Sequence, residues 1–202
     1  MAADVEIVEL GPEHVDDYLA LFDAAFREFP DWAGCYCAFY DAPAGQPFDP
    51  EDPEGEGAQH RADRAARIRS GGAHGLLAYR DGAPVGWCNV APRSQVPNLR
   101  KFAEAVVDPA DEPAVVMCFV IHPDHRGQGV ASDLLAGALD AARRWGSPWV
   151  EGYPARPDSD TDGLPWAAAF YKGPLRMYEA AGFAVTRDMG DWLVVRRDVP
   201  AD

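Results

Sequence analysis

The sequence predicts an α/β fold in which seven strands are interspersed with helices. Its 202 residues are 48% hydrophobic and 25% charged, which is typical of a globular chain that buries its own core. The segment 114–121 is almost wholly apolar and predicts a strand buried on both faces. Apolar residues then recur at helical spacing from Val130 to Trp145, with charged residues opposite them. We expect a single domain over residues 1–202.

The N-terminal quarter predicts a strand and a helix. Residues 5–10 alternate well enough for a first strand, and Gly11 and Pro12 then open a helix that Pro30 ends. Residues 35–40 are short, apolar and aromatic, and they fit either a buried strand or a turn of helix.

The middle of the chain predicts a loop, a helix and a hairpin. Residues 41–57 are rich in proline, glycine and acid, which is typical of a loop, whereas 58–70 carry helix formers. Residues 75–79 and 83–90 predict a hairpin, because Asp-Gly lies between them. Residues 91–112 look irregular, with one helical turn.

The C-terminal part predicts a strand at 149–153, a short helix at 174–181, and strands near 183–188 and 191–196. A second Pro/Asp/Gly-rich loop covers 154–165. Long loops in compact domains are often functional, so this loop and the first one could frame a substrate mouth.

Residues 126–131, Arg-Gly-Gln-Gly-Val-Ala, lie where the buried strand gives way to the long helix. Two glycines let the backbone approach a ligand, and successive N–H groups at a helix start point at one spot. Arg126 adds a planar cation. The turn lacks the Gly-Lys-Ser/Thr of a Walker loop and the third glycine of a dinucleotide fingerprint. We therefore predict a pyrophosphate site built mostly from main-chain groups.

The turn and its lead-in, 121–125, resemble the Gln/Arg-x-x-Gly-x-Gly/Ala signature of the GNAT superfamily of acyl-CoA-dependent N-acetyltransferases. Residues 178–183, Tyr-Glu-Ala-Ala-Gly-Phe, are similar to the Tyr-Glu-x-x-Gly-Phe segment that closes the last helix of that fold. The resemblance covers roughly 113–187. It implies a GNAT-type mixed, mostly antiparallel central sheet of about seven strands flanked by helices, with acyl-CoA in the splay beside the central strand.

The same resemblance implies acetyl-CoA as co-substrate and no metal. Main-chain groups of Phe119, Val120 and Ile121 would hold pantetheine and the acetyl group, with an N–H near Phe119 or Val120 facing the thioester oxygen. The diphosphate would be bound by Arg126, Gly127, Gln128, Gly129, Val130 and Ala131. Five cations could reach the outer phosphate: Arg93, Arg100, Lys101, Arg143 and Arg144.

Tyr178 is the predicted general acid, because a phenol with a pKa of about 10 can protonate the departing thiolate. Tyr171 is the alternative candidate for the general acid. The structural alternative is that Tyr178 is a core residue whose hydroxyl is bonded elsewhere. The base is poorly marked, since the central strand offers only Cys118 where some relatives carry a carboxylate. We take Glu151 as the candidate general base. The alternatives are Glu28, Asp31, Asp41, Glu112 and a chain of waters.

Other conspicuous side chains favour structural roles. Cys35 and Cys37 lack the second pair of a zinc site and suit buried, reduced thiols. His122 and His125 flank the turn and are expected to be exposed loop residues. Three tryptophans could line an acceptor pocket or pack in the core: Trp32, Trp87 and Trp166.

The net charge is −15, from 33 acidic and 18 basic residues. Such a chain repels nucleic acid and attracts cationic small molecules, although solubility explains the charge equally well. No apolar run is long enough for a membrane span, and the acidic N-terminus is unlike a signal peptide, so we expect a cytoplasmic protein.

We therefore expect an N-acetyltransferase that acetylates a primary amine of a small cationic molecule by direct attack in a ternary complex. The acceptor classes are aminoglycoside-like antibiotics, polyamines and amino-acid derivatives. The alternatives are a protein N-terminal or lysine acetyltransferase, transfer of a longer acyl group, and a non-catalytic acyl-CoA or drug-binding module. A homodimer is compatible with each.

Overall fold

A seven-stranded sheet organises the chain in the computed structural model, which describes residues 4–27, 34–41, 53–101, 111–157 and 171–200. The strand order is β1-β2-β3-β4-β5-β7-β6. The strands are β1 (Glu6–Glu9), β2 (Leu76–Arg80), β3 (Ala83–Pro92), β4 (Ala114–Ile121), β5 (Trp149–Gly152), β6 (Ala184–Asp188) and β7 (Leu193–Asp198). Each neighbouring pair is antiparallel except β4 and β5, which are parallel. The expected mixed, mostly antiparallel sheet is confirmed.

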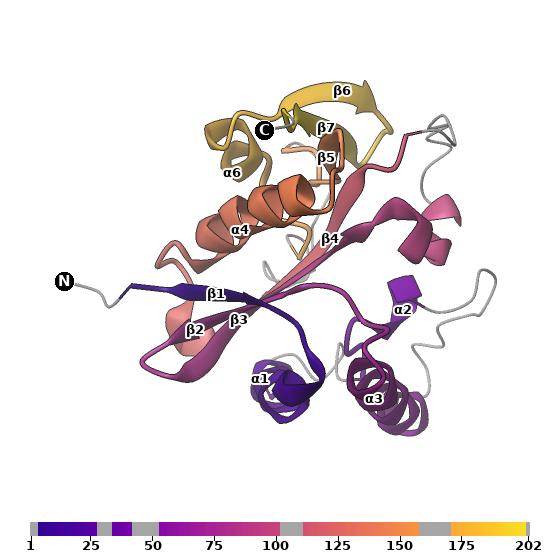
Figure 1. Cartoon of the computed structure of the whole chain (residues 1–202), viewed down its shortest axis with the longest axis vertical. Coiled ribbons are helices and arrows are strands. Elements are labelled where there is room, and N and C mark those ends of the chain that lie inside the picture. Colours follow the sequence, from indigo (N-terminus) through magenta and orange to yellow (C-terminus); the bar gives the residue numbers. More distant parts are fainter. Residues whose placement is uncertain (1–3, 28–33, 42–52, 102–110, 158–170, 201–202) are drawn as a thin grey trace.

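Helices cover both faces of this sheet (Figure 1). The helices are α1 (Val15–Phe26), α2 (Ala38–Asp41), α3 (Pro53–Arg69), α4 (Val130–Arg144) and α6 (Leu175–Ala180). Short 3-10 turns span Pro12–His14, Arg93–Gln95, Pro97–Lys101 and Pro123–His125. One apolar core joins α1, α2 and α3 to the sheet, and the other lies beneath α4 and α6.

Most predicted elements are confirmed, and the differences concern helix starts. Gly11 and Pro12 lead into a 3-10 turn, and the α-helix begins only at Val15. The third helix starts at Pro53, inside the segment expected to be a loop. Proline lacks an N–H, which a first helical turn does not need, so a proline-rich segment can still open a helix. Residues 35–37 lead through a turn into α2, which contains residues 38–40, so the helical alternative is confirmed there.

A β-bulge and a divergence of strands set up the middle of the sheet. Asn89 pairs with Cys118 while Val90 pairs with Val116, so Met117 is an extra residue in β4. Met117 and Cys118 consequently both pack into the core on the α1 side. Strand β4 pairs with β5 only over 114–116 and then continues to Ile121 without it. The two parallel strands therefore separate beyond the bulge.

Candidate acyl-transfer site

The turn between β4 and α4 has the open backbone that an anion site needs. Gly127 and Gly129 have φ angles of +70° and +89°, and a Cβ built on either would meet no atom within 4 Å. The N–H groups of Ser132 and Asp133 both donate to the carbonyl of Gly129, at 2.8 and 3.1 Å. The amides preceding them, at the start of α4, lack intrahelical acceptors and are suited to a ligand.

Side chains around the turn hold its shape. The Gln128 amide donates to the carbonyl of Asp124 at 2.8 Å and accepts from Arg80 at 2.5 Å. Arg126 Nε donates to the carbonyl of Ile121 at 3.3 Å. Arg80 is only 8% exposed and adds a second guanidinium beside the turn. Sequence reasoning missed Arg80 because it ends β2, far from the motif, and nothing local marks it.

Main-chain groups of β4 face the gap that the diverging strands leave. Phe119 N–H donates across this gap to the carbonyl of Tyr171 at 2.6 Å, and the Ile121 carbonyl accepts from Arg126. Val120 pairs with Trp87, and His122 N–H donates to the carbonyl of Val85, so even-numbered groups face β3. Of the two amides expected near the thioester oxygen, that of Phe119 is the one that faces this gap.

Tyr178 lies on α6 against the same gap, fully buried. Its hydroxyl donates to the carbonyl of Lys172 at 2.8 Å, and its ring meets Phe183 edge-on at 5.2 Å. A Cβ on Gly152 would lie 2.3 Å from the ring, so β5 needs a glycine there. Burial raises the pKa of Tyr178 well above 10, which keeps the phenol protonated at neutral pH.

Glu151 lies on β5 with its carboxylate held by three donors. Arg93 contacts Oε2 at 3.3 Å, the Tyr153 hydroxyl donates to Oε2 at 3.0 Å, and Trp149 Nε1 donates to Oε1 at 3.3 Å. The side chain is 9% exposed. Two donors bind Oε2 and one binds Oε1, so the lone-pair site that a proton could use is the second one on Oε1.

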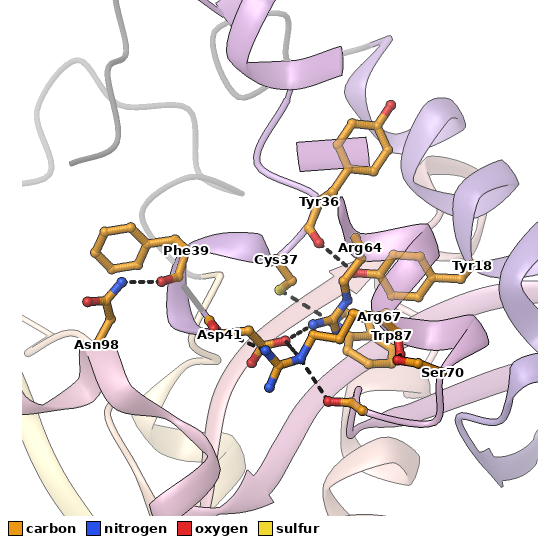
Figure 2. A network of polar contacts seen from close by, with 11 residues as sticks. Tyr18, Tyr36, Cys37, Phe39, Asp41, Arg64, Arg67, Ser70, Trp87 and Asn98 are labelled. Carbon is orange, nitrogen blue, oxygen red and sulfur yellow. Dashed lines mark hydrogen bonds and ion pairs between the residues drawn. The ribbon is translucent and has the colours of Figure 1, made fainter. Parts of the chain in front are cut away.

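The segment 35–41 forms a buried polar network on the α1 side (Figure 2). Arg64 of α3 is 1% exposed, forms an ion pair with Asp41, and lies 5.2 Å from the ring centroid of Tyr18 and 5.4 Å from that of Trp87. Trp87 is thus a core residue rather than a pocket wall. Asp41 is held in the ion pair and is not placed as a free base.

Two thiols meet beside this network. Trp87 Nε1 donates to Cys37 Sγ at 3.4 Å (Figure 2). A hydrogen bond from Cys118 and the charge of Arg64 lower the pKa of Cys37 to about 7, against the effect of burial. The same hydrogen bond, together with burial, raises the pKa of Cys118. Tyr36 and Cys37 have φ angles of +40° and +52°, a rare conformation in which this turn is held.

Three of the five cations proposed for the outer phosphate form ion pairs with carboxylates. Arg93 is paired with Glu151, Arg143 with Asp140 at 2.5 Å, and Arg144 with Glu9. The last two lie at the C-terminal end of α4, a helix length from the turn. The side chains of Arg100 and Lys101 lie outside the described residues, as do these other candidates: Glu28, Asp31, Trp32 and Trp166.

A family model for the acetyltransferase (GNAT) family matches residues 35–151, more than half of the chain. The chain belongs to the GNAT family. It is accordingly an acyltransferase that uses acetyl-CoA. The match ends at Glu151 and so leaves Tyr178 outside it.

Solved structures show the same fold as this GNAT enzyme. The GNAT domain of Streptomyces lividans PAT matches with a TM-score of 0.55 and 16% identity, over 96% of this chain and 90% of that one. yncA of Salmonella typhimurium, solved with acetyl-CoA, matches with a TM-score of 0.54 and 16% identity, over 97% and 94%. The PaiA N-acetyltransferase of Thermoplasma acidophilum, in complex with coenzyme A, gives 0.53 and 14%, over 96% and 99%. A comparison with curated proteins gives no significant match.

The described residues contain no cluster of metal ligands and no helix suited to span a membrane. Among them no group of three or more His, Cys, Asp or Glu side chains could hold a metal ion. None of the helices described there is long and apolar enough to cross a membrane.

Proposed function

We propose that this GNAT enzyme transfers the acetyl group of acetyl-CoA to a primary amine of a small, cationic molecule. One observation carries the proposal: the open Arg126–Ala131 turn and the gap beside β4 adjoin, joined by the hydrogen bond from Arg126 to Ile121. An extended ligand with a diphosphate at one end and a thioester at the other suits this arrangement. Main-chain amides of the turn would bind the diphosphate, with Arg126 as counter-charge.

The reaction joins the amine nitrogen to the thioester carbon and breaks the bond from that carbon to sulfur. Phe119 N–H would face the carbonyl oxygen, where negative charge develops in the transition state. Tyr178 would give its hydroxyl proton to the departing thiolate, a role that its burial supports by keeping it protonated. Both donors now bond to main-chain carbonyls and must exchange these for substrate.

The proton released by the amine needs an acceptor, and Glu151 is the candidate we retain. It lies on β5 opposite Val115, one residue before the last pair that β5 forms with β4. Because Arg93, Tyr153 and Trp149 hold the carboxylate, a water between Glu151 and the amine suits the geometry better than direct contact. Glu151→Gln should lower kcat, measured by release of free thiol with a primary amine as acceptor.

The acceptor class rests on the net charge of −15, which attracts cations. We further propose that the chain acts as one domain in the cytoplasm. Four cysteines without disulfides suit a reducing compartment.

The test is a panel of amines with acetyl-CoA, followed by release of free thiol. We expect turnover with small primary amines and coenzyme A binding that Arg126→Gln weakens. Thiol release with protein lysine as the only effective acceptor would indicate the alternative function, a protein lysine acetyltransferase. Coenzyme A binding without turnover on any amine would indicate a non-catalytic module, and no binding at all would reject the site.

A further inference from the structure

Two consecutive residues of the chain hold both donors of the acyl site. The carbonyl of Tyr171 accepts from Phe119 N–H at 2.6 Å, and the carbonyl of Lys172 accepts from the Tyr178 hydroxyl at 2.8 Å. The next residue, Gly173, has a φ of +84°, and a Cβ there would lie 3.2 Å from the rings of both Phe119 and Tyr178. These residues therefore fill the gap beside β4 where the thioester is expected.

The side chain of Lys172 extends from this segment onto an aromatic surface. It is 3% exposed, although lysine is rarely buried. Its Nζ lies 4.0 Å from the ring centroid of Trp192 and 5.6 Å from that of Tyr171. The faces of aromatic rings attract ammonium groups. Trp192 follows the β6–β7 turn and bridges to Ala155, just beyond β5, so this surface borders the same gap.

The environment of Lys172 also suits the chemistry of an acceptor. Burial lowers the pKa of Lys172 to about 8. An alkylamine bound in the same place would lose its proton as readily, and only the neutral amine attacks a thioester. The subsite would thus favour the neutral, reactive form of a bound amine.

We infer that Lys172 occupies the acceptor subsite as an internal analogue of the substrate, and that the acceptor is a primary alkylamine bound against Trp192. The inference rests on the proposed function and names its substrate class and a specificity residue. The lysine side chain is itself a butylamine, which sets the size of group that fits. A free alkylamine and the lysine of a peptide share this chemistry.

The chain has two lysines, Lys101 and Lys172, so enzyme labelled with 13C at lysine Cε gives two side-chain signals. Lys101→Arg assigns them. We expect the Lys172 signal to be shifted by the Trp192 ring and to lose this shift in Trp192→Leu. Adding n-butylamine should move the signal towards that of free lysine, whereas the isosteric n-butanol should not. A Lys172 signal that resembles free lysine from the start, or that ignores n-butylamine, overturns the inference.

Kinetics give a second measurement. Lys172→Ala vacates the subsite, so the KM for n-butylamine should fall roughly tenfold while that for acetyl-CoA changes less. Arg61→Ala, which removes an exposed cation paired with Asp23, is the matched control for charge and should change neither. An unchanged or higher KM for n-butylamine in Lys172→Ala, with the protein folded, counts against the inference.

The two proposals fail in different ways. Turnover of n-butylamine without displacement of Lys172 overturns the inference and leaves the proposed function standing. Displacement of Lys172 without any turnover supports the subsite and counts against the proposed function. Comparing n-butylamine with a lysine-containing peptide separates the two sources of the amine: saturation at lower concentration by n-butylamine supports a small acceptor, and the reverse order supports a protein acceptor.

Discussion

At the scale of single residues, close packing fixes the predicted general acid. The ring of Tyr178 lies directly on Gly152, where even a methyl group would come within 2.3 Å. Gly152→Ala should therefore push the ring aside, lower kcat and cost about 1–3 kcal/mol of folding free energy. Gly72→Ala is the matched control, because its Cβ would approach no atom closer than 3.5 Å. Steady-state kinetics and denaturant unfolding measure both effects, and equal behaviour of the two variants would contradict the placement.

The hydroxyl of Tyr178 has a structural and a chemical role that one variant can separate. Tyr178→Phe leaves the Lys172 carbonyl without its donor, at a cost of about 1–3 kcal/mol in stability. If the hydroxyl acts as the general acid, its removal should also lower kcat by about 10²-fold or more, while the affinity for coenzyme A changes by no more than a few-fold. Calorimetric titration with coenzyme A and thiol-release kinetics give the two numbers. A stable variant with full kcat would remove Tyr178 from the mechanism.

Lys172 should make the free energy of unfolding rise with pH, whereas a lysine whose charged form is stabilised by folding makes it fall. Its pKa is lowered from 10.5 to about 8 by burial, so between these values the unfolded chain binds more protons than the native one. Stability should therefore rise as pH increases from 8 to 10.5, by roughly 3 kcal/mol at most for this group. The measurement is the difference in unfolding free energy between wild type and Lys172→Met at pH 7 and pH 10. A constant difference would show that the ammonium is not desolvated.

At the scale of elements, the strand, turn and helix from 114 to 144 were predictable because their signals are local. An apolar run, two glycines and a 3.6-residue period each act within a few residues. The bulge at Met117 was not predictable, since it depends on the register with β3. The contact of Tyr171 with Phe119 joins residues 52 positions apart, beyond any local pattern. Glu151 was correctly placed on a strand, but its three donors come from tertiary packing.

The Arg126–Ala131 turn allows a test that separates backbone strain from ligand binding. Gly129→Ala puts a methyl group into the space where a diphosphate would lie, at a φ of +89°. Gly82→Ala in the β2–β3 turn has a similar φ of +77° and equally open surroundings, so it carries the same strain without the ligand. Both variants should lose about 1–2 kcal/mol of stability, and only Gly129→Ala should also weaken coenzyme A binding, by about tenfold. Equal affinities would argue against the turn as the diphosphate site.

At the scale of the whole molecule, the sheet separates two environments that meet at β4. The bulge turns Cys118 towards α1, whereas Phe119 packs beneath α4 and α6. An acyl donor approaching along α4 and an amine approaching from the α1 side would thus meet at one strand. The strand can serve both because its main-chain groups face the gap while its side chains remain in the two cores.

The net charge of −15 acts on the two substrates with opposite sign. A cationic amine is attracted by the overall field, which salt screens over about 8 Å at physiological ionic strength. Coenzyme A is an anion, and in the proposed site oriented amides and nearby guanidinium groups would bind it at short range, where screening is weaker. Raising the salt concentration from 0.02 to about 0.5 M should therefore increase the KM of a cationic amine several-fold and leave coenzyme A affinity nearly unchanged. A neutral analogue of the amine is the control for general salt effects, and a KM for the cation that does not respond to salt would show that the charge serves solubility alone.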